Sequence, residues 1–268
     1  MIRVLFVAIA LTSILVGCNN ESGSKEKESE VIAPPIISYQ VVQTYPHDTS
    51  SYTQGLEWHN NELFESTGQY GFSKLLKVNL KDGKILQSHS LSKEYFGEGM
   101  TILNNKIYQL TWQNKKGFVY DLKTFSTIQE FEWPYEGWGL TNNGKDLLIS
   151  TGSNVIYRVD PSSFKILEAI SVSNQYGPLS NINELEWVNG FIYANIYQTD
   201  KIAKIDPRNG KVVGEMYFTD ILQKLNIPFD AYKADVLNGI AFNPTNGNFF
   251  VTGKYWPALI EISLLENK

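Results

Sequence analysis

Short stretches of alternating apolar and polar residues, separated by turns that contain asparagine or glycine, fill most of this chain. Such stretches predict β-strands. Five segments that are similar to one another each place an asparagine-containing turn before an apolar strand: residues 60–68, 104–112, 143–152, 189–197 and 246–254. A second matched strand comes after each one: residues 75–80, 117–122, 155–160, 202–206 and 259–263. The pattern therefore predicts a repeated unit of strands.

A short phrase opens each unit. It reads QGLEW at residues 54–58, EGMT at 98–101, WGLT at 138–141, NELEW at 183–187 and NGIAF at 238–242. By subtraction, its middle residues (55, 99, 139, 184 and 239) are 44, 40, 45 and 55 positions apart. A period of roughly 40–50 residues built from short strands is typical of propeller blades. We therefore predict an all-β fold, a five-bladed β-propeller of four-stranded antiparallel blades.

The two ends of the folded region are expected to close the ring together. The fifth unit runs out of chain near Lys268, one strand short, whereas the strand predicted at residues 37–44 has no unit of its own. Pairing the two would complete the last blade and leave no exposed sheet edge. Residues 36–268 then form the propeller. A single β-sandwich is the alternative, but a sandwich does not require a phrase that recurs at this spacing.

The longest interval between phrases contains the sequence TDILQKL at residues 219–225. Asp220 in this sequence is a candidate cap for a short helix. We interpret this segment as a surface insertion between the fourth and fifth blades.

The N-terminal segment has the composition of an export signal. Arg3 precedes an apolar run over residues 4–16, which is shorter than the roughly 20 residues that span a bilayer. The sequence LVGC at residues 15–18 resembles a bacterial lipobox, so we expect Cys18 to be acylated after removal of a signal peptide, residues 1–18. Residues 19–35 begin with a stretch that lacks apolar side chains and are predicted to be a disordered tether. The protein is thus expected to be an exported lipoprotein at the cell-envelope membrane.

Composition narrows the possible partners and chemistries. The formal net charge is −5 and no basic cluster occurs, which argues against nucleic acid as a partner. Cys18 is the only cysteine, so an intramolecular disulfide is excluded. The three histidines, His47, His59 and His89, lack paired metal-ligand spacing.

Polar residues within and beside the phrases are the candidates for chemistry. Gln54, Glu98, Asn183 and Asn238 begin four of the phrases, and Lys254 follows the second strand of the last unit. Blade packing needs none of these groups, and polar side chains that face a channel cost free energy unless something binds them. A carboxylate among aromatic residues would have a raised pKa, which suits acid–base chemistry near neutral pH. Glu98 is therefore the candidate catalytic group.

These motifs also resemble a known family. The sequences YTQGL at 52–56, FGEGMT at 96–101, LTW at 110–112, EGWGLT at 136–141, NELEW at 183–187 and TGKYWP at 252–257 are similar to motifs of glutaminyl-peptide cyclotransferases of the plant and bacterial type. The similarity runs in order through all five units, from about residue 41 to residue 262. The family has a five-bladed propeller fold, as the repeat predicts.

The resemblance implies a reaction and a set of site residues. N-terminal glutamine of a peptide or protein cyclises to pyroglutamate and releases ammonia, with no metal and no cofactor. Glu98 matches the proton-carrying glutamate. The resemblance implies that the following residues bind the substrate: Gln54, Phe96, Trp112, Trp138, Asn183, Tyr197 and Lys254. Two positions depart from the family: Tyr197 stands where tryptophan is often found, and Tyr52 where phenylalanine is common.

Other hypotheses remain open at this stage. A non-catalytic propeller could bind peptides or proteins at the same rim, although pure binding would not need a proton carrier. A metal-dependent propeller hydrolase such as a lactonase would need several inward-facing carboxylate or asparagine ligands. We expect a monomer that reaches the membrane through its lipid anchor only.

Overall fold

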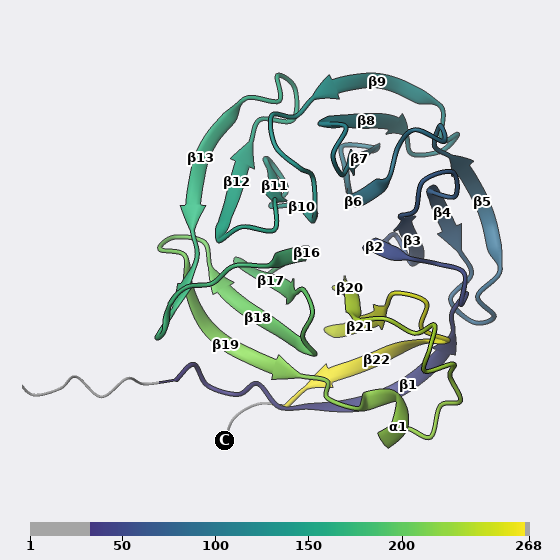
Figure 1. The fold of residues 1–268 in the computed structure, drawn as a ribbon, viewed down its shortest axis with the longest axis vertical. Helices are drawn as coiled ribbons and strands as arrows, with labels where there is room; N and C mark the ends of the chain where they lie inside the picture. The colour runs from purple at the N-terminus through teal and green to yellow at the C-terminus, as the bar shows by residue number, and fades with distance from the viewer. Residues whose placement is uncertain (1–32, 266–268) are drawn as a thin grey trace, which may run out of the picture. The chain divides into compact units, whose positions relative to one another are not determined.

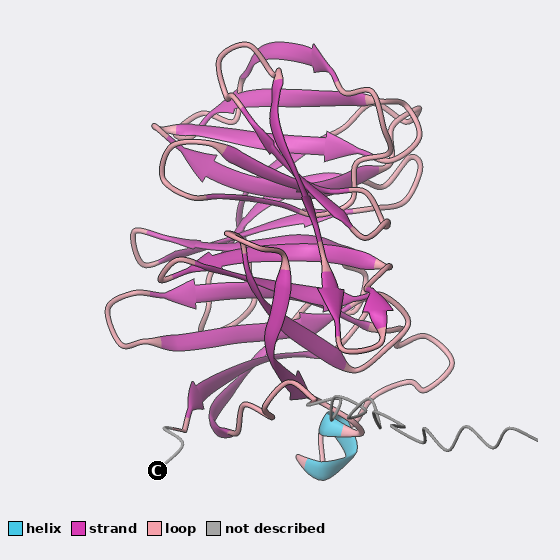
Figure 2. Cartoon of the chain, turned by 90° about the vertical axis from the view of Figure 1, so that its left-hand side faces the viewer, coloured by secondary structure: helices cyan, strands magenta, loops and turns pink. Residues whose placement is uncertain are grey.

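The computed structural model describes residues 33–265. These residues form five sheets around a central axis, as Figure 1 shows in the view down that axis. Figure 2 shows that strands and loops make up nearly all of this part of the chain. The predicted five-bladed propeller is confirmed. The predicted domains at residues 1–18 and 19–35 fall wholly or mainly outside the described residues.

The first three blades each contain four consecutive antiparallel strands, ordered from the axis outward. Blade one comprises β2 (Thr53–His59), β3 (Glu62–Thr67), β4 (Lys74–Val78) and β5 (Ile85–Ser90). Blade two comprises β6 (Gly97–Leu103), β7 (Lys106–Thr111), β8 (Lys116–Asp121) and β9 (Thr127–Glu132). Blade three comprises β10 (Leu140–Asn142), β11 (Leu147–Ser150), β12 (Val155–Val159) and β13 (Ile166–Ser171).

The fourth blade carries an addition that the sequence did not predict. Its four main strands are β16 (Ile182–Val188), β17 (Phe191–Ile196), β18 (Lys201–Asp206) and β19 (Lys211–Tyr217). A small hairpin, β14 (Ser173–Asn174) with β15 (Gly177–Pro178), extends this sheet, because β14 pairs in parallel with the outer strand β19. The blade therefore has six strands.

The fifth blade closes the ring as predicted. Strands β20 (Leu237–Asn243), β21 (Asn248–Gly253) and β22 (Ala258–Leu264) pair in order, and β1 (Tyr39–Pro46) pairs antiparallel with β22 as the outermost strand. Figure 1 shows this strand of the N-terminal region beside the yellow end of the chain. Each of the five blades therefore contains at least four paired strands.

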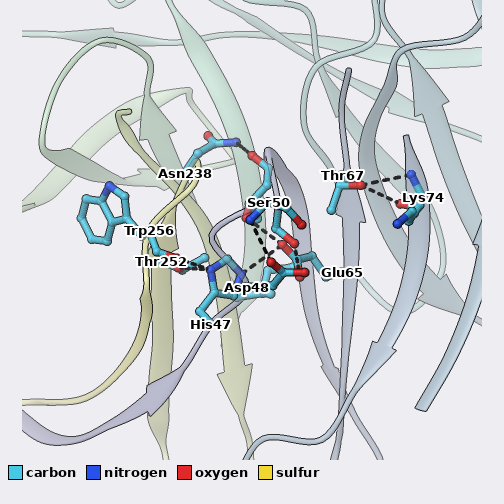
Figure 3. Close-up of polar contacts among 12 residues, drawn as sticks. His47, Asp48, Ser50, Glu65, Thr67, Lys74, Asn238, Thr252 and Trp256 are labelled. Atoms are coloured by element: carbon cyan, nitrogen blue, oxygen red, sulfur yellow. Dashed lines mark hydrogen bonds and ion pairs between the residues drawn. The ribbon is translucent and has the colours of Figure 1, made fainter. Parts of the chain in front are cut away.

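A buried polar cluster fastens this closure (Figure 3). His47, just after β1, places Nδ1 2.8 Å from the Trp256 carbonyl oxygen and Nε2 3.1 Å from Glu65 Oε1. Both ring nitrogens face oxygen acceptors, as an imidazolium requires. Burial alone would lower the pKa of His47, but the charge and hydrogen bond of Glu65 raise it above its usual value. The cluster therefore joins the closing strand to blades one and five.

The hydrophobic core lies between the blades. Five clusters of buried apolar side chains each draw their members from two neighbouring blades, so every blade interface has its own cluster. Fully burying one such side chain contributes about 1.5–3 kcal/mol. The insertion between blades four and five joins this scheme, because Ile221 and Leu222 of helix α1 (Ile221–Lys224) belong to the cluster of that interface.

The predicted cap of α1 is partly wrong. Asp220 occupies the N-cap position, but its backbone lies in the left-handed region with φ 54°, and its side chain makes no capping hydrogen bond. The helix is therefore held by its buried apolar residues. Within residues 33–265 we find no helix with the length and apolar character that a membrane span requires.

Candidate active site

A cavity of about 190 Å³ lies at the entry end of the inner strands. All eight residues that sequence analysis proposed for the site line it: Gln54, Phe96, Glu98, Trp112, Trp138, Asn183, Tyr197 and Lys254. Tyr52 and Gln69 complete the lining. Tyr52 and Lys254, which are 202 positions apart by subtraction, thus meet in one pocket.

Irregular strand pairing places the polar residues of the phrases. The pairing of an inner strand with its neighbour shifts register between Thr53 and Gly55, between Gly97 and Met100, and between Ile182 and Leu185. A β-bulge of this kind breaks the regular alternation and redirects a side chain. Gln54, Glu98 and Asn183 all lie inside these bulges.

Close packing of the inner strands explains the glycines of the phrases. A Cβ atom on Gly55 would lie 2.6 Å from the backbone nitrogen of Met100 in the next blade, and one on Gly139 would clash with the carbonyl of Asn183. Such distances are too short for any side chain to be accommodated. Gly55 therefore allows β2 to approach the strand that carries Glu98, and Gly139 allows the start of blade three to approach the strand that carries Asn183.

Asn238 does not lie where the polar pattern suggested. It sits in the equivalent bulge of blade five, but it does not line the pocket. Its amide nitrogen donates to the Thr53 carbonyl at 2.9 Å and to Gln54 Oε1 at 3.2 Å. Asn238 thus supports Gln54 from behind. Since its bonds fix Gln54 Oε1 as an acceptor, the Gln54 amide nitrogen is left for other partners.

Glu98 is a buried carboxyl group that faces the pocket, with 4% of its surface exposed. Burial raises its pKa well above the usual value. The nearby positive charge of Lys254 and a hydrogen bond from Gln54 oppose this shift, whereas the negative charge of Glu136 adds to it. A carboxyl group with a raised pKa can both accept and release a proton near neutral pH.

A relay of hydrogen bonds holds the backbone of Glu98. The Ser66 hydroxyl donates to the Glu98 carbonyl oxygen and accepts a hydrogen bond from Gln109 Nε2 at 2.8 Å. Tyr120 in turn donates to Gln109 Oε1 at 2.9 Å. All these residues are buried. The strand that carries Glu98 is therefore fixed against β3 and β8.

Lys254 is the positive group of the pocket, with 2% of its surface exposed. Burial lowers its pKa to about 8, although Glu98 and Asp235 oppose the shift. Its ammonium group lies 4.3 Å from the ring centre of Tyr52 and 4.9 Å from that of Tyr197. Aromatic faces attract a cation at such distances, which stabilises the charge without neutralising it.

Asn183 presents an unsatisfied acceptor. Its side-chain oxygen is buried and has no hydrogen-bond partner within residues 33–265. An unpaired buried polar atom costs about 1–3 kcal/mol. Because Asn183 also lines the pocket, a bound molecule with an N–H group would recover this cost.

Aromatic side chains form most of the wall. Phe96 packs edge-to-face on Trp112 with ring centres 5.6 Å apart, and Trp138 packs on Tyr197 at 5.5 Å. One oxygen of Glu136 accepts the indole N–H of both Trp112, at 2.8 Å, and Trp138, at 3.2 Å. Glu136 therefore fixes the two tryptophans relative to one another, and its charge also acts on Glu98.

Sequence reasoning assigned no role to Glu136, Gln69 or Tyr52. Glu136 lies in the EGWGLT motif two residues before Trp138, so its position was visible but its contact with both indoles was not. Tyr52 begins the YTQGL motif. For Gln69 no signal could be found. Within residues 33–265, no three His, Cys, Asp or Glu side chains gather closely enough to hold a metal ion.

These features define a class: a five-bladed propeller with an acid–base pocket at the entry end of its inner strands. Residues 10–264 match the model of the glutamine cyclotransferase family, and the chain belongs to that family. It is 37% identical over 247 residues to the glutaminyl-peptide cyclotransferase of Arabidopsis thaliana, which covers 91% of this chain and 77% of the relative. The crystal structure of Myxococcus xanthus glutaminyl cyclase superposes with a TM-score of 0.80 at 33% identity, covering 86% of this chain and 98% of that one.

Proposed function

We propose that this pocket converts the N-terminal glutamine of peptides to pyroglutamate, with Glu98 as the proton carrier. The observation that carries the proposal is the buried Glu98 carboxyl, which faces a small aromatic pocket beside Lys254 and has a raised pKa. Membership in the glutamine cyclotransferase family supports the reaction.

The reaction is a cyclisation within one residue. The α-amino nitrogen attacks the side-chain amide carbon, a nitrogen–carbon bond forms, and the bond from that carbon to the amide nitrogen breaks, so that ammonia leaves. Because both reacting groups belong to one residue, the pocket has only to select the folded-back conformation. The cavity of about 190 Å³ and its aromatic walls fit such a compact substrate.

Glu98 serves both proton transfers in sequence. Its carboxylate accepts a proton from the attacking amine, and the resulting carboxylic acid donates a proton to the departing nitrogen. General acid–base catalysis of this kind contributes about 10²–10⁴-fold. Burial and the charge of Glu136 hold the pKa of Glu98 high enough for both steps.

Lys254 and Asn183 take complementary roles. The Lys254 ammonium stabilises the negative charge that develops on the amide oxygen, an effect worth about 10²–10³-fold for one well-placed donor. The unpaired Asn183 oxygen accepts an N–H of the α-amine and orients it. Gln54 hydrogen-bonds Glu98 and positions its carboxyl group.

An ammonia-release assay tests the proposal. The purified protein should release ammonia from a glutamine-initiated peptide, and mass spectrometry should show the loss of one ammonia from that peptide. A peptide that begins with asparagine is the matched control, since its shorter side chain cannot form the five-membered ring. Absence of ammonia release from the glutamine peptide would reject the activity.

We also propose that Cys18 carries a lipid and that the protein is a monomer at the cell-envelope membrane. The lipobox-like LVGC sequence and the polar stretch after it support the lipid anchor. Fractionation of cells should find the wild-type protein with membranes and Cys18→Ala in the soluble fraction. Equal distribution of the two proteins would reject the anchor.

A further inference from the structure

A second cavity, of about 280 Å³, adjoins the active-site pocket. Gln69 lines both, and the second cavity extends outward from it between the loop after β1 and strands β3 to β5 of blade one. We propose that this cavity binds the residues that follow the N-terminal glutamine of the substrate and favours an apolar side chain there. This inference rests on the proposed function and adds a preference for peptide sequence.

Gln69 and Tyr255 form a partition between the two cavities. Gln69 and Tyr255 both line the second cavity, and the Gln69 side chain lies close enough to the Tyr255 hydroxyl to oppose the rise that burial causes in its pKa. The Tyr255 ring centre lies 5.1 Å from that of Tyr52, which lines the first pocket. A peptide that leaves the pocket across Gln69 therefore enters the second cavity directly.

Backbone hydrogen bonds hold this partition in place. The Gln69 carbonyl accepts from the backbone nitrogens of Phe72, at 3.0 Å, and Ser73, at 2.9 Å, and Tyr255 donates to the Ser51 carbonyl at 2.8 Å. Both Gln69, with φ 99°, and Tyr255, with φ 61°, have the left-handed backbone that non-glycine residues seldom adopt. Residues held in such conformations often lie at functional sites.

The shared lining residue defines which peptide residue would occupy each cavity. An extended chain spans about 3.3–3.6 Å per residue, so two residues cover about 7 Å. With glutamine in the first pocket, the proposal places the second residue over Gln69 and the third in the adjoining cavity. Two other cavities share no lining residue with the active-site pocket. One lies beside α1, and the other is lined in part by Glu57 and Glu186.

The walls of the second cavity favour an apolar residue. Phe72 is 76% exposed and Ile85 is 44% exposed, and Leu76 lies buried beside them. Large apolar side chains exposed around a hollow indicate a binding surface. The charged groups at this cavity, Asp48 and Lys74, have opposite signs, so neither acidic nor basic substrates gain a clear advantage.

A substrate series tests the preference. We would measure kcat/KM for the amides of Gln-Ala, Gln-Ala-Ala and Gln-Ala-Leu with the wild type, Phe72→Ala and the control Tyr176→Ala. Tyr176 is also highly exposed, but it belongs to the segment between β14 and β15 of blade four. We expect the wild type to prefer Gln-Ala-Leu over Gln-Ala-Ala by about five- to tenfold, as partial burial of a leucine predicts.

Phe72→Ala should reduce this ratio to near one, and Tyr176→Ala should leave it unchanged. Equal wild-type rates for the two tripeptides, or a ratio that Phe72→Ala does not alter, would overturn the inference. If an aspartate at the third position proved best and Lys74→Ala removed that preference, the apolar assignment would be wrong. Failure to cyclise the dipeptide Gln-Ala amide would instead contradict the proposed function itself.

Discussion

The inner strands carry buried carboxyl groups toward both ends of the channel, and the two ends use them differently. At the entry end, Glu98 faces the cavity, with Lys254 and Gln54 as neighbours. On the inner strands β2 and β16 lie the partly buried Glu57 and the buried Glu184 and Glu186. Burial raises the pKa of all four groups, so the pKa shift alone does not tell them apart.

Their hydrogen-bond partners do tell them apart. Glu184 occupies the phrase position that is glycine in the other four blades, and its carboxylate accepts the backbone N–H of Leu56, at 3.2 Å, and of Ile240, at 2.9 Å. It therefore joins blade four to blades one and five. Glu186 accepts the backbone N–H of Phe242 at 2.8 Å. Such carboxylates hold the ring together, whereas Glu98 remains available to a substrate.

Lys254 is the charged neighbour of Glu98, and of the substitutions considered next, its substitution should have the largest effect on turnover. Lys254→Met removes the charge that stabilises the developing oxyanion, so kcat should fall by about 10²–10³-fold. The folded-state pKa of about 8 lies below the usual 10.5. Folding therefore disfavours the charged form, and this cost is full below about pH 8 and vanishes above the unfolded pKa.

The same variant should consequently be more stable at neutral pH, by up to about 3 kcal/mol. Chemical denaturation and steady-state kinetics on one preparation measure both effects. In the wild type, activity should also decline as pH rises through about 8, because Lys254 loses its proton. A Lys254→Met protein with full activity would contradict its assignment to the pocket chemistry.

Substituting Glu184 should show the opposite pattern. Glu184→Ala leaves two buried backbone N–H groups without partners, and the free energy of unfolding should drop by about 2–4 kcal/mol. Activity per folded molecule should change little, since Glu184 does not line the pocket. The exposed Glu94 supplies a control, and Glu94→Ala should alter stability by less than about 0.5 kcal/mol. Equal losses from both variants would show that the bonds of Glu184 do not stabilise the ring.

Glu136 links the aromatic wall to the proton carrier, and its substitution should have an intermediate effect. Glu136→Gln removes a negative charge that raises the pKa of Glu98, so the acid limb of the kcat/KM profile should move to lower pH. A neutral amide oxygen accepts the two indole N–H groups more weakly than a carboxylate does, so kcat/KM at neutral pH should fall by about tenfold. The exposed Glu132→Gln is the matched control. A profile that overlays the wild type would exclude the electrostatic role of Glu136.

Of these substitutions, Glu57→Gln should have the smallest effect, and it should change only the stability of the protein. The pKa of Glu57 is raised from 4.5 to about 7, so its favourable contribution is complete below about pH 4.5 and is lost as pH rises through about 7. The melting temperature of the wild type should therefore fall between about pH 4.5 and about pH 7 more steeply than that of Glu57→Gln. Parallel curves for the two proteins would contradict the raised pKa.

Most of the fold could be predicted from the sequence. The recurring phrase, the matched strands and the unpaired strand at the N-terminal side predicted five blades and their closure. The β14–β15 hairpin and the side chain of Asp220 were not predicted correctly. Pairing to a neighbouring strand and backbone dihedral angles decide those features, and neither is visible in the pattern of polar and apolar residues.

Most residues of the candidate site could be predicted from the sequence, but their contacts with one another could not. The polar residues of the phrases and the family resemblance together indicated eight of the ten residues that line the pocket, and the roles of these eight remain predictions. Asn238 looked equivalent to Gln54, yet only tertiary structure shows that it supports Gln54 from behind. Glu136 was missed because its role depends on where two indole N–H groups lie.

The most direct test of the account compares Glu98→Gln with Glu184→Gln in the same ammonia-release assay. Both changes replace a buried carboxyl group of raised pKa on an inner strand with a neutral side chain of similar size. We predict that Glu98→Gln lowers kcat by about 10²–10⁴-fold with little change in stability. Glu184→Gln should lower stability and leave kcat of the folded protein within a few-fold of wild type. Near-wild-type turnover by Glu98→Gln, or equal loss of turnover in both variants, would contradict the assignment of Glu98 as the proton carrier.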